Sequence, residues 1–84
     1  MAKALVFTKH ALSVMAERQI VPEWVERTAT TPQWEEVDLG DSEVLRRFRS
    51  VPERGGRYLR VACVETATEI RILSAFLDRC ARPK

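Results

Sequence analysis

A histidine and an arginine near the start of the chain have types and a spacing that could support chemistry on a phosphate. His10 is the only histidine in the sequence, and Arg18 follows it by eight residues. On a helix this is roughly two turns, so both side chains would lie roughly in line on one face. Histidine titrates near neutral pH and can act as a base or an acid, whereas arginine can hold a phosphate bidentately. The structural alternative for His10 is a hydrogen bond to the backbone of its own first helical turn.

Positive charge is concentrated in the second half of the chain. Residues 1–42 carry four basic and seven acidic side chains, whereas residues 43–84 carry ten and five, and nine of those ten are arginines. The guanidinium group is a planar fork of donors that matches phosphate, so this half predicts a polyanionic partner. A solvated basic surface is the alternative interpretation. The candidate nucleic-acid contacts are Arg46, Arg47, Arg49, Arg57, Arg71 and Arg79.

The two cysteines do not predict a metal centre. Cys63 lies in an apolar run and is expected to be a small buried residue, and Cys80 has no C-x-x-C partner. A zinc site of His10, Cys63 and Cys80 would lack a fourth ligand. No export signal is recognised at the N-terminus, which favours reduced thiols. We therefore expect no metal and no cofactor.

The length of 84 residues fits one small domain over residues 1–84. A chain of this size buries only roughly 60–65% of its unfolded surface, so its core is small and a homodimer would bury additional apolar surface. Trp24 and Trp34 are expected to fill that core rather than to stack on bases. No apolar run approaches the roughly 20 residues of a membrane-spanning helix, so we expect a cytoplasmic protein without a membrane partner.

The elements that would position these residues begin with a short strand and two helices. The stretch Leu5–Thr8 could form an edge strand, and the apolar spacing after it predicts a helix over Lys9–Gln19 with Thr8 as its N-cap. Pro22 suits the first turn of a second helix. That helix must end by Thr31, because the proline at position 32 disfavours helical geometry at the residue before it.

The middle of the chain has weaker signals. Residues 34–39 alternate loosely, as a strand would, and a turn follows at Gly40 and Asp41. A third short helix is predicted from Ser42 to just before Pro52. Its polar face would hold Arg46, Arg47 and Arg49.

The clearest strands are Arg57–Glu65 and Glu69–Leu77, which are apolar at nearly every position. A three-residue loop would pair them as an antiparallel hairpin with Arg60 opposite Ser74. That face would also hold Tyr58, Ala62, Val64, Ile70, Ile72 and Phe76, while Leu59, Val61, Cys63, Leu73, Ala75 and Leu77 would pack on the helices. The predicted fold class is α+β, with N-terminal helices packed on a three- to four-stranded antiparallel sheet.

Three stretches in this order resemble a bacterial domain-of-unknown-function family, number 4258. HALSVMAERQI resembles its opening H-A-x-x-R-M-x-x-R-x-I, and GGRYLRVACVET and IRILSAFLDR resemble its closing hairpin. The family is similar, more distantly, to the BrnT and RelE ribonuclease toxins. Their K-H-G and R-I-I-S-A-R stretches correspond to KHA and RILSAF here. The resemblance implies a barnase-, RelE- or BrnT-like fold, RNA as the substrate, and often a toxin role with a cognate antitoxin.

The chain departs from the family pattern at one position. Val14 stands where the pattern has an arginine, four residues after His10. If that arginine holds phosphate in the family, this protein would be weakened or inactive as a nuclease. RNA binding without cleavage, or a non-catalytic protein-interaction module, is therefore an alternative to a ribonuclease toxin.

Metal-free RNA cleavage needs a base for the 2′-hydroxyl, an acid for the leaving 5′ oxygen and cations for the charge on the phosphorane. In that reaction His10 would carry the proton, and Arg18 and Arg60 would clamp the phosphate. Ser74 would donate a hydrogen bond or position the substrate. Structural alternatives exist for each, since a cation near a helix C-terminus is favourable without a ligand, and Arg60 could simply pair with Ser74 across the strands.

Overall fold

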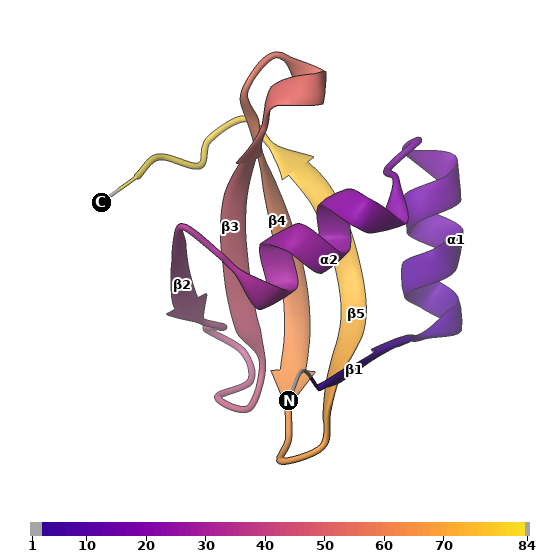
Figure 1. Ribbon diagram of the computed structural model, residues 1–84. Helices are drawn as coiled ribbons and strands as arrows, with labels where there is room; N and C mark the ends of the chain where they lie inside the picture. The colour runs from indigo at the N-terminus through magenta and orange to yellow at the C-terminus, as the bar shows by residue number, and fades with distance from the viewer. Residues whose placement is uncertain (1–2, 84) are drawn as a thin grey trace.

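Two helices pack on a five-stranded mixed sheet in the computed structural model, which describes residues 3–83 (Figure 1). The strands lie in the order β1-β5-β4-β3-β2, with β1 parallel to β5 and the other neighbours antiparallel. The elements are β1 (Ala4–Phe7), α1 (Lys9–Glu17), α2 (Pro22–Thr30), β2 (Trp34–Val37), β3 (Leu45–Val51), the 3-10 turn η1 (Pro52–Arg54), β4 (Arg57–Glu65) and β5 (Glu69–Asp78).

The predicted α+β class with N-terminal helices is confirmed, but the predicted sheet was wrong in two respects. Among residues 3–83 the sheet has five strands rather than three to four, and it is not purely antiparallel. The missed pairing joins β1 to β5, near opposite ends of the chain. Such a pairing depends on packing between distant segments and has no local turn signal.

The predicted third helix was wrong, because residues 45–51 form β3. Arg47, Arg49 and Val51 point toward the helices, and Arg46, Phe48 and Ser50 point to the other side. This is the two-residue period of a strand. Because β3 lies between β2 and β4, both of its edges are paired, which outweighs the local helical spacing.

The helix α1 is fixed at both ends. The Thr8 side chain accepts a hydrogen bond from the Ala11 backbone N–H at 3.1 Å, which confirms Thr8 as the N-cap. At the other end, Gln19 adopts a left-handed φ of 57°, and the Ile20 N–H donates to the Met15 carbonyl at 2.8 Å. This left-handed residue and this hydrogen bond are the features of a Schellman motif. They set the direction in which Arg18, the C-cap residue, leaves the helix.

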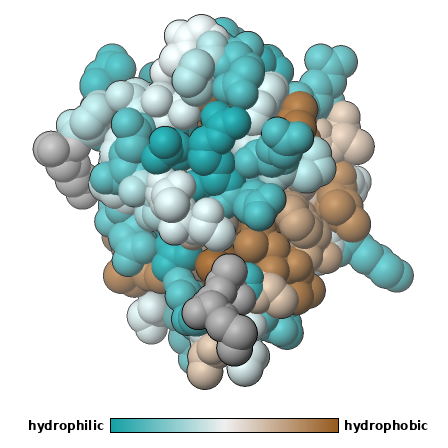
Figure 2. All heavy atoms as spheres, viewed as in Figure 1, coloured by the Kyte–Doolittle hydropathy of each residue, from teal (hydrophilic) through white to brown (hydrophobic). Residues whose placement is uncertain are grey.

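One apolar core lies between the helices and the sheet. Its fully covered members include Ala11 and Val25 from the helices and Leu59, Val61 and Ile72 from the sheet. Cys63 is also fully buried, as expected, and burial raises the pKa of its thiol. Figure 2 shows the helix-covered side, where hydrophilic side chains gather over α2. Within residues 3–83, no helix is long and apolar enough to cross a membrane.

The predicted register of the β4–β5 hairpin was wrong. Ser74 lies opposite Ala62, and Arg60 lies opposite Phe76. A β-bulge at Leu73 shifts the register, because Cys63 already pairs with Ile72. As a result, Ile70 and Ile72 point into the core rather than to the opposite face.

We call the sheet surface away from the helices the open face. It includes Trp34, Glu36, Arg46, Phe48, Ser50, Tyr58, Arg60, Ala62, Ser74, Phe76 and Asp78. Neither α1 nor α2 covers it, since both helices pack on the core side of β3, β4 and β5. In Figure 1 the segment after β5 passes behind the strands, on the side away from α2.

Candidate nucleic-acid interface

Two arginines from distant parts of the chain converge on one aromatic ring. The guanidinium carbon of Arg60 lies 4.0 Å from the centroid of Phe76, and that of Arg18 lies 5.6 Å from it. Arg60 comes from the middle of β4, and Arg18 from the end of α1. The two cations therefore border one patch of the open face. The contacts with the ring are favourable cation–π interactions.

The two guanidinium groups keep few partners within the protein. Arg60 Nη1 lies 3.4 Å from Asp78 Oδ2, and Arg18 Nη1 donates to the Ala75 carbonyl at 3.4 Å. Partial burial lowers the pKa of Arg60, and the positive charge of Arg46 acts in the same direction. Arginine still remains charged at neutral pH. Both groups therefore have unused N–H donors that could form hydrogen bonds with an anion.

Ser74 lies beside this arginine pair. It occupies the same face as Phe76, two residues earlier on β5, and its cross-strand neighbour is the small Ala62. The predicted direct pairing of Arg60 with Ser74 was wrong, so the two residues are diagonal neighbours. Within residues 3–83 the Ser74 hydroxyl has no hydrogen-bond partner, which leaves it free to donate.

His10 is the second residue of α1, and its side chain is exposed. Thr8 caps the helix, so His10 is not needed for that role. In the described part of the chain the imidazole makes no hydrogen bond or ion pair, including to Arg18 or Arg60. Arg18 and Arg60 thus share the Phe76 ring. His10 lies two helical turns before Arg18, at the other end of α1.

Val14, which replaces the arginine of the family pattern, is buried on α1 one turn before Arg18. It has 8% exposure and lies outside the core cluster. The position thus holds an apolar contact where the pattern would place a third cation.

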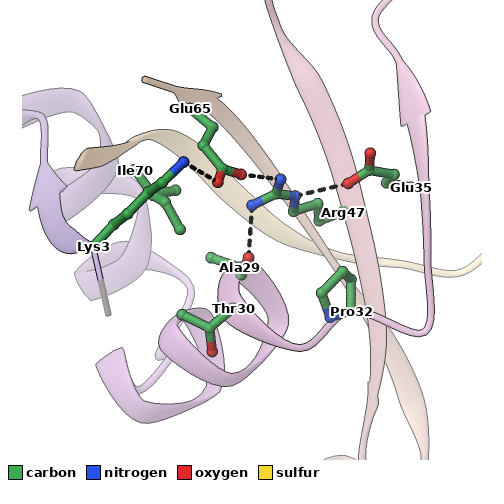
Figure 3. Close-up of a pocket in the computed structure, with 8 residues that line it drawn as sticks. All are labelled: Lys3, Ala29, Thr30, Pro32, Glu35, Arg47, Glu65 and Ile70. Carbon is green, nitrogen blue, oxygen red and sulfur yellow. Dashed lines mark hydrogen bonds and ion pairs between the residues drawn. The ribbon is translucent and has the colours of Figure 1, made fainter. Parts of the chain in front are cut away.

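Arg47 lies on the helix-covered side, where it is 8% exposed (Figure 3). It donates to the Ala29 carbonyl at 2.7 Å and to Glu35 at 3.0 Å, and it also pairs with Glu65. Burial alone would lower the pKa of Arg47, but the bonds to Glu65 and Glu35 outweigh it and the pKa is raised. Arg47 is therefore a structural cation with its donors in use.

The other predicted contacts are dispersed. Arg46 lies on the open face and pairs with Asp38 at 2.9 Å, and this pairing lowers the pKa of the Asp38 carboxyl. Arg49 donates to the Thr31 carbonyl at 2.7 Å, and the exposed Arg71 pairs with Glu69 at 3.0 Å. Arg57 at the start of β4 and Arg79 after β5 are exposed, and neither has an ion-pair partner within residues 3–83.

The open face also carries an aromatic cluster that the sequence interpretation missed. Trp34 stacks on Phe48 with centroids 4.8 Å apart and an interplanar angle of 7°, and Tyr58 meets Trp34 edge-on at 5.2 Å. Trp24 lies in the core as predicted, but Trp34 does not. The two-residue spacing of Phe48 from Arg46 was the available signal, but the helix prediction for this segment concealed it.

The fold and this surface define an α+β protein whose open sheet face combines arginines with aromatic rings. The chain belongs to the family described as Domain of unknown function (DUF4258), whose family model matches residues 7–76. That range includes His10, Arg18, Arg60 and Ser74. No curated protein and no solved structure matches the chain.

Proposed function

We propose that this protein is a small RNA-directed protein that binds an RNA phosphodiester on its open face, between Arg18 and Arg60. The observation that carries the proposal is the convergence of these two guanidinium groups on Phe76, at 5.6 and 4.0 Å. A phosphate placed there would accept charge-assisted hydrogen bonds from both groups. The Ser74 hydroxyl supplies a third donor on the same face.

RNA cleavage is the catalytic form of this proposal. The similarity of KHA and RILSAF to BrnT and RelE toxin stretches favours a metal-free ribonuclease toxin with a cognate antitoxin. His10 would transfer protons, because its exposed imidazole is accessible to a bound strand. RNA binding without cleavage is the second candidate, and it is favoured by the separation of His10 from the arginine pair and by Val14.

The binding proposal is tested with two variants that each remove one positive charge from β4. Arg60→Gln removes a donor from the open face. Arg57→Gln removes an exposed charge at the start of the same strand, at a position that points to the helix-covered side of the sheet. We expect roughly tenfold weaker binding of a labelled RNA for Arg60→Gln, as for a lost hydrogen bond to a charged group. Arg57→Gln should lose less than about twofold, as for a distant charge at physiological salt. Equal losses would contradict the proposal.

Cleavage is tested by inducing the wild type and His10→Ala in cells while following growth and total RNA. A ribonuclease toxin predicts growth arrest and RNA loss that the substitution abolishes. In chelator-containing buffer, the purified wild type should cleave RNA and His10→Ala should not, if His10 transfers the protons. Harmless expression of both proteins would exclude the toxin form and leave RNA binding as the function.

A further inference from the structure

A pocket on the open face shares Arg60 with the proposed phosphate site. It has a volume of about 370 Å³ and lies between the sheet and the segment 80–83 after β5. This volume falls within the roughly 300–1,000 Å³ of typical small-ligand pockets. Trp34 and Phe48 are its aromatic residues. Its charged groups are three arginines and two carboxylates: Arg46, Arg60, Arg82, Glu36 and Asp78.

The aromatic part of the pocket is flat and fixed in place. The Trp34 and Phe48 rings are nearly parallel and stacked on each other, and Tyr58 holds Trp34 from the side. Phe48 is only 4% exposed, although it lies outside the core cluster. Fixed aromatic faces on a sheet are suitable for stacking unpaired bases, because every base has a π-face.

The polar groups of the pocket match the edge of a base better than they match a bare phosphate. Arg46 and Arg60 can donate hydrogen bonds, whereas Asp78 can accept them. The buried indole N–H of Trp34 also has no acceptor within residues 3–83. Buried donors without partners are rare in folded proteins. A surface that combines donors, an acceptor and flat rings has the components of base recognition.

We infer that this pocket binds one unpaired nucleobase of an RNA strand whose adjacent phosphate lies at Arg18 and Arg60. The inference rests on the proposed function and names its substrate class as single-stranded RNA. Arg60 lines the pocket and also contacts Phe76, so the base and its phosphate would lie on either side of this one side chain. A paired base cannot enter, because its edge and both faces are occupied in a duplex.

The test compares three RNA probes of equal length on the full chain: an unpaired strand, an abasic strand and a duplex. We expect the unpaired strand to bind at least tenfold more tightly than either of the others. It should also quench a tryptophan emission that is absent from Trp34→Leu. Trp24→Phe, a substitution in the core on the other side of the sheet, should keep both the affinity and the quenching. The fold of each variant is checked by circular dichroism.

The three probes give a result with the wild-type protein alone, so base binding and phosphate binding are distinguished even if a variant fails to fold. Equal binding of unpaired and abasic strands, or of unpaired strand and duplex, would overturn the base pocket and leave phosphate binding intact. Failure of all three probes to bind would overturn both. Tight binding of the unpaired strand without any change in tryptophan emission would place the base elsewhere and would also overturn the inference.

Discussion

The two faces of the sheet use the same residue type in different ways, and Arg47 and Arg60 show the difference. Arg47 lies beneath α2, where a carbonyl and two carboxylates accept its hydrogen bonds. Arg60 lies on the open face with one carboxylate at 3.4 Å and an aromatic ring. A buried cation must be fully paired to be tolerated, whereas a partly exposed one can keep donors unused. The open face is therefore the side of the sheet with arginine donors available to a ligand.

The largest effect expected from this contrast is on stability. Arg47→Met keeps most of the side-chain volume but removes the donor to Glu35 and to the Ala29 carbonyl, and it leaves Glu65 with Lys3 alone. Loss of one member of a buried ion pair costs about 3–5 kcal/mol, and partial exposure of the two carboxylates reduces this to about 2–3 kcal/mol here. Urea unfolding measures the change in the free energy of unfolding.

The matched substitution on the open face is Arg60→Met. Its ion pair with Asp78 is long and partly exposed, so the free energy of unfolding should fall by less than about 1 kcal/mol. Similar losses for Arg47→Met and Arg60→Met would mean that the two faces do not differ as described.

A smaller effect sharpens the comparison within the open face itself. If Arg18 and Arg60 hold the same phosphate, their contributions to RNA affinity are coupled. A double-mutant cycle with Arg18→Gln and Arg60→Gln should give a coupling energy of about 0.5–1 kcal/mol, within the range for groups that share a partner. Strict additivity would show that the two guanidinium groups bind separate parts of the RNA.

The smallest expected effect is on the loss of stability at acidic pH. Hydrogen bonds from Lys3 and Arg47 hold the pKa of Glu65 below its ordinary value of 4.5. The unfolded chain then binds the proton more readily, so this contribution to stability is complete above pH 4.5 and is lost as the pH falls through the folded pKa. Glu65→Gln should make stability less sensitive to pH below 4.5. An unchanged acid profile would show that Glu65 is not held in this way.

Much of the local structure could be predicted from the sequence. Thr8, Pro22 and Pro32 are local signals, and they set the limits of α1 and α2 to within a residue or two. The range of β4 was predicted to the residue, because its apolar run begins after a glycine pair. β3 was mistaken for a helix, since its charged residues occupy both faces and conceal the two-residue period.

The candidate site could be predicted only in part, because it depends on distant pairings. Arg18 and Arg60 were selected from their types and from a family resemblance, but only the packing of α1 on β5 brings them to Phe76. The bulge at Leu73 decides which side chains of β5 share the open face, and the sequence has no signal for it. Arg47 was included among the RNA contacts because its segment was predicted as a helix with Arg47 on the polar face, but it is buried on the helix-covered side of β3.

The most direct test of the central claim is to titrate the isotope-labelled protein with a short RNA and follow the arginine Nε–Hε resonances. Binding on the open face predicts saturable shifts at Arg18 and Arg60, while the buried Arg47 and the helix-facing Arg57 remain unmoved. Shifts that follow only the exposure of each arginine, or that omit Arg60, would contradict the account.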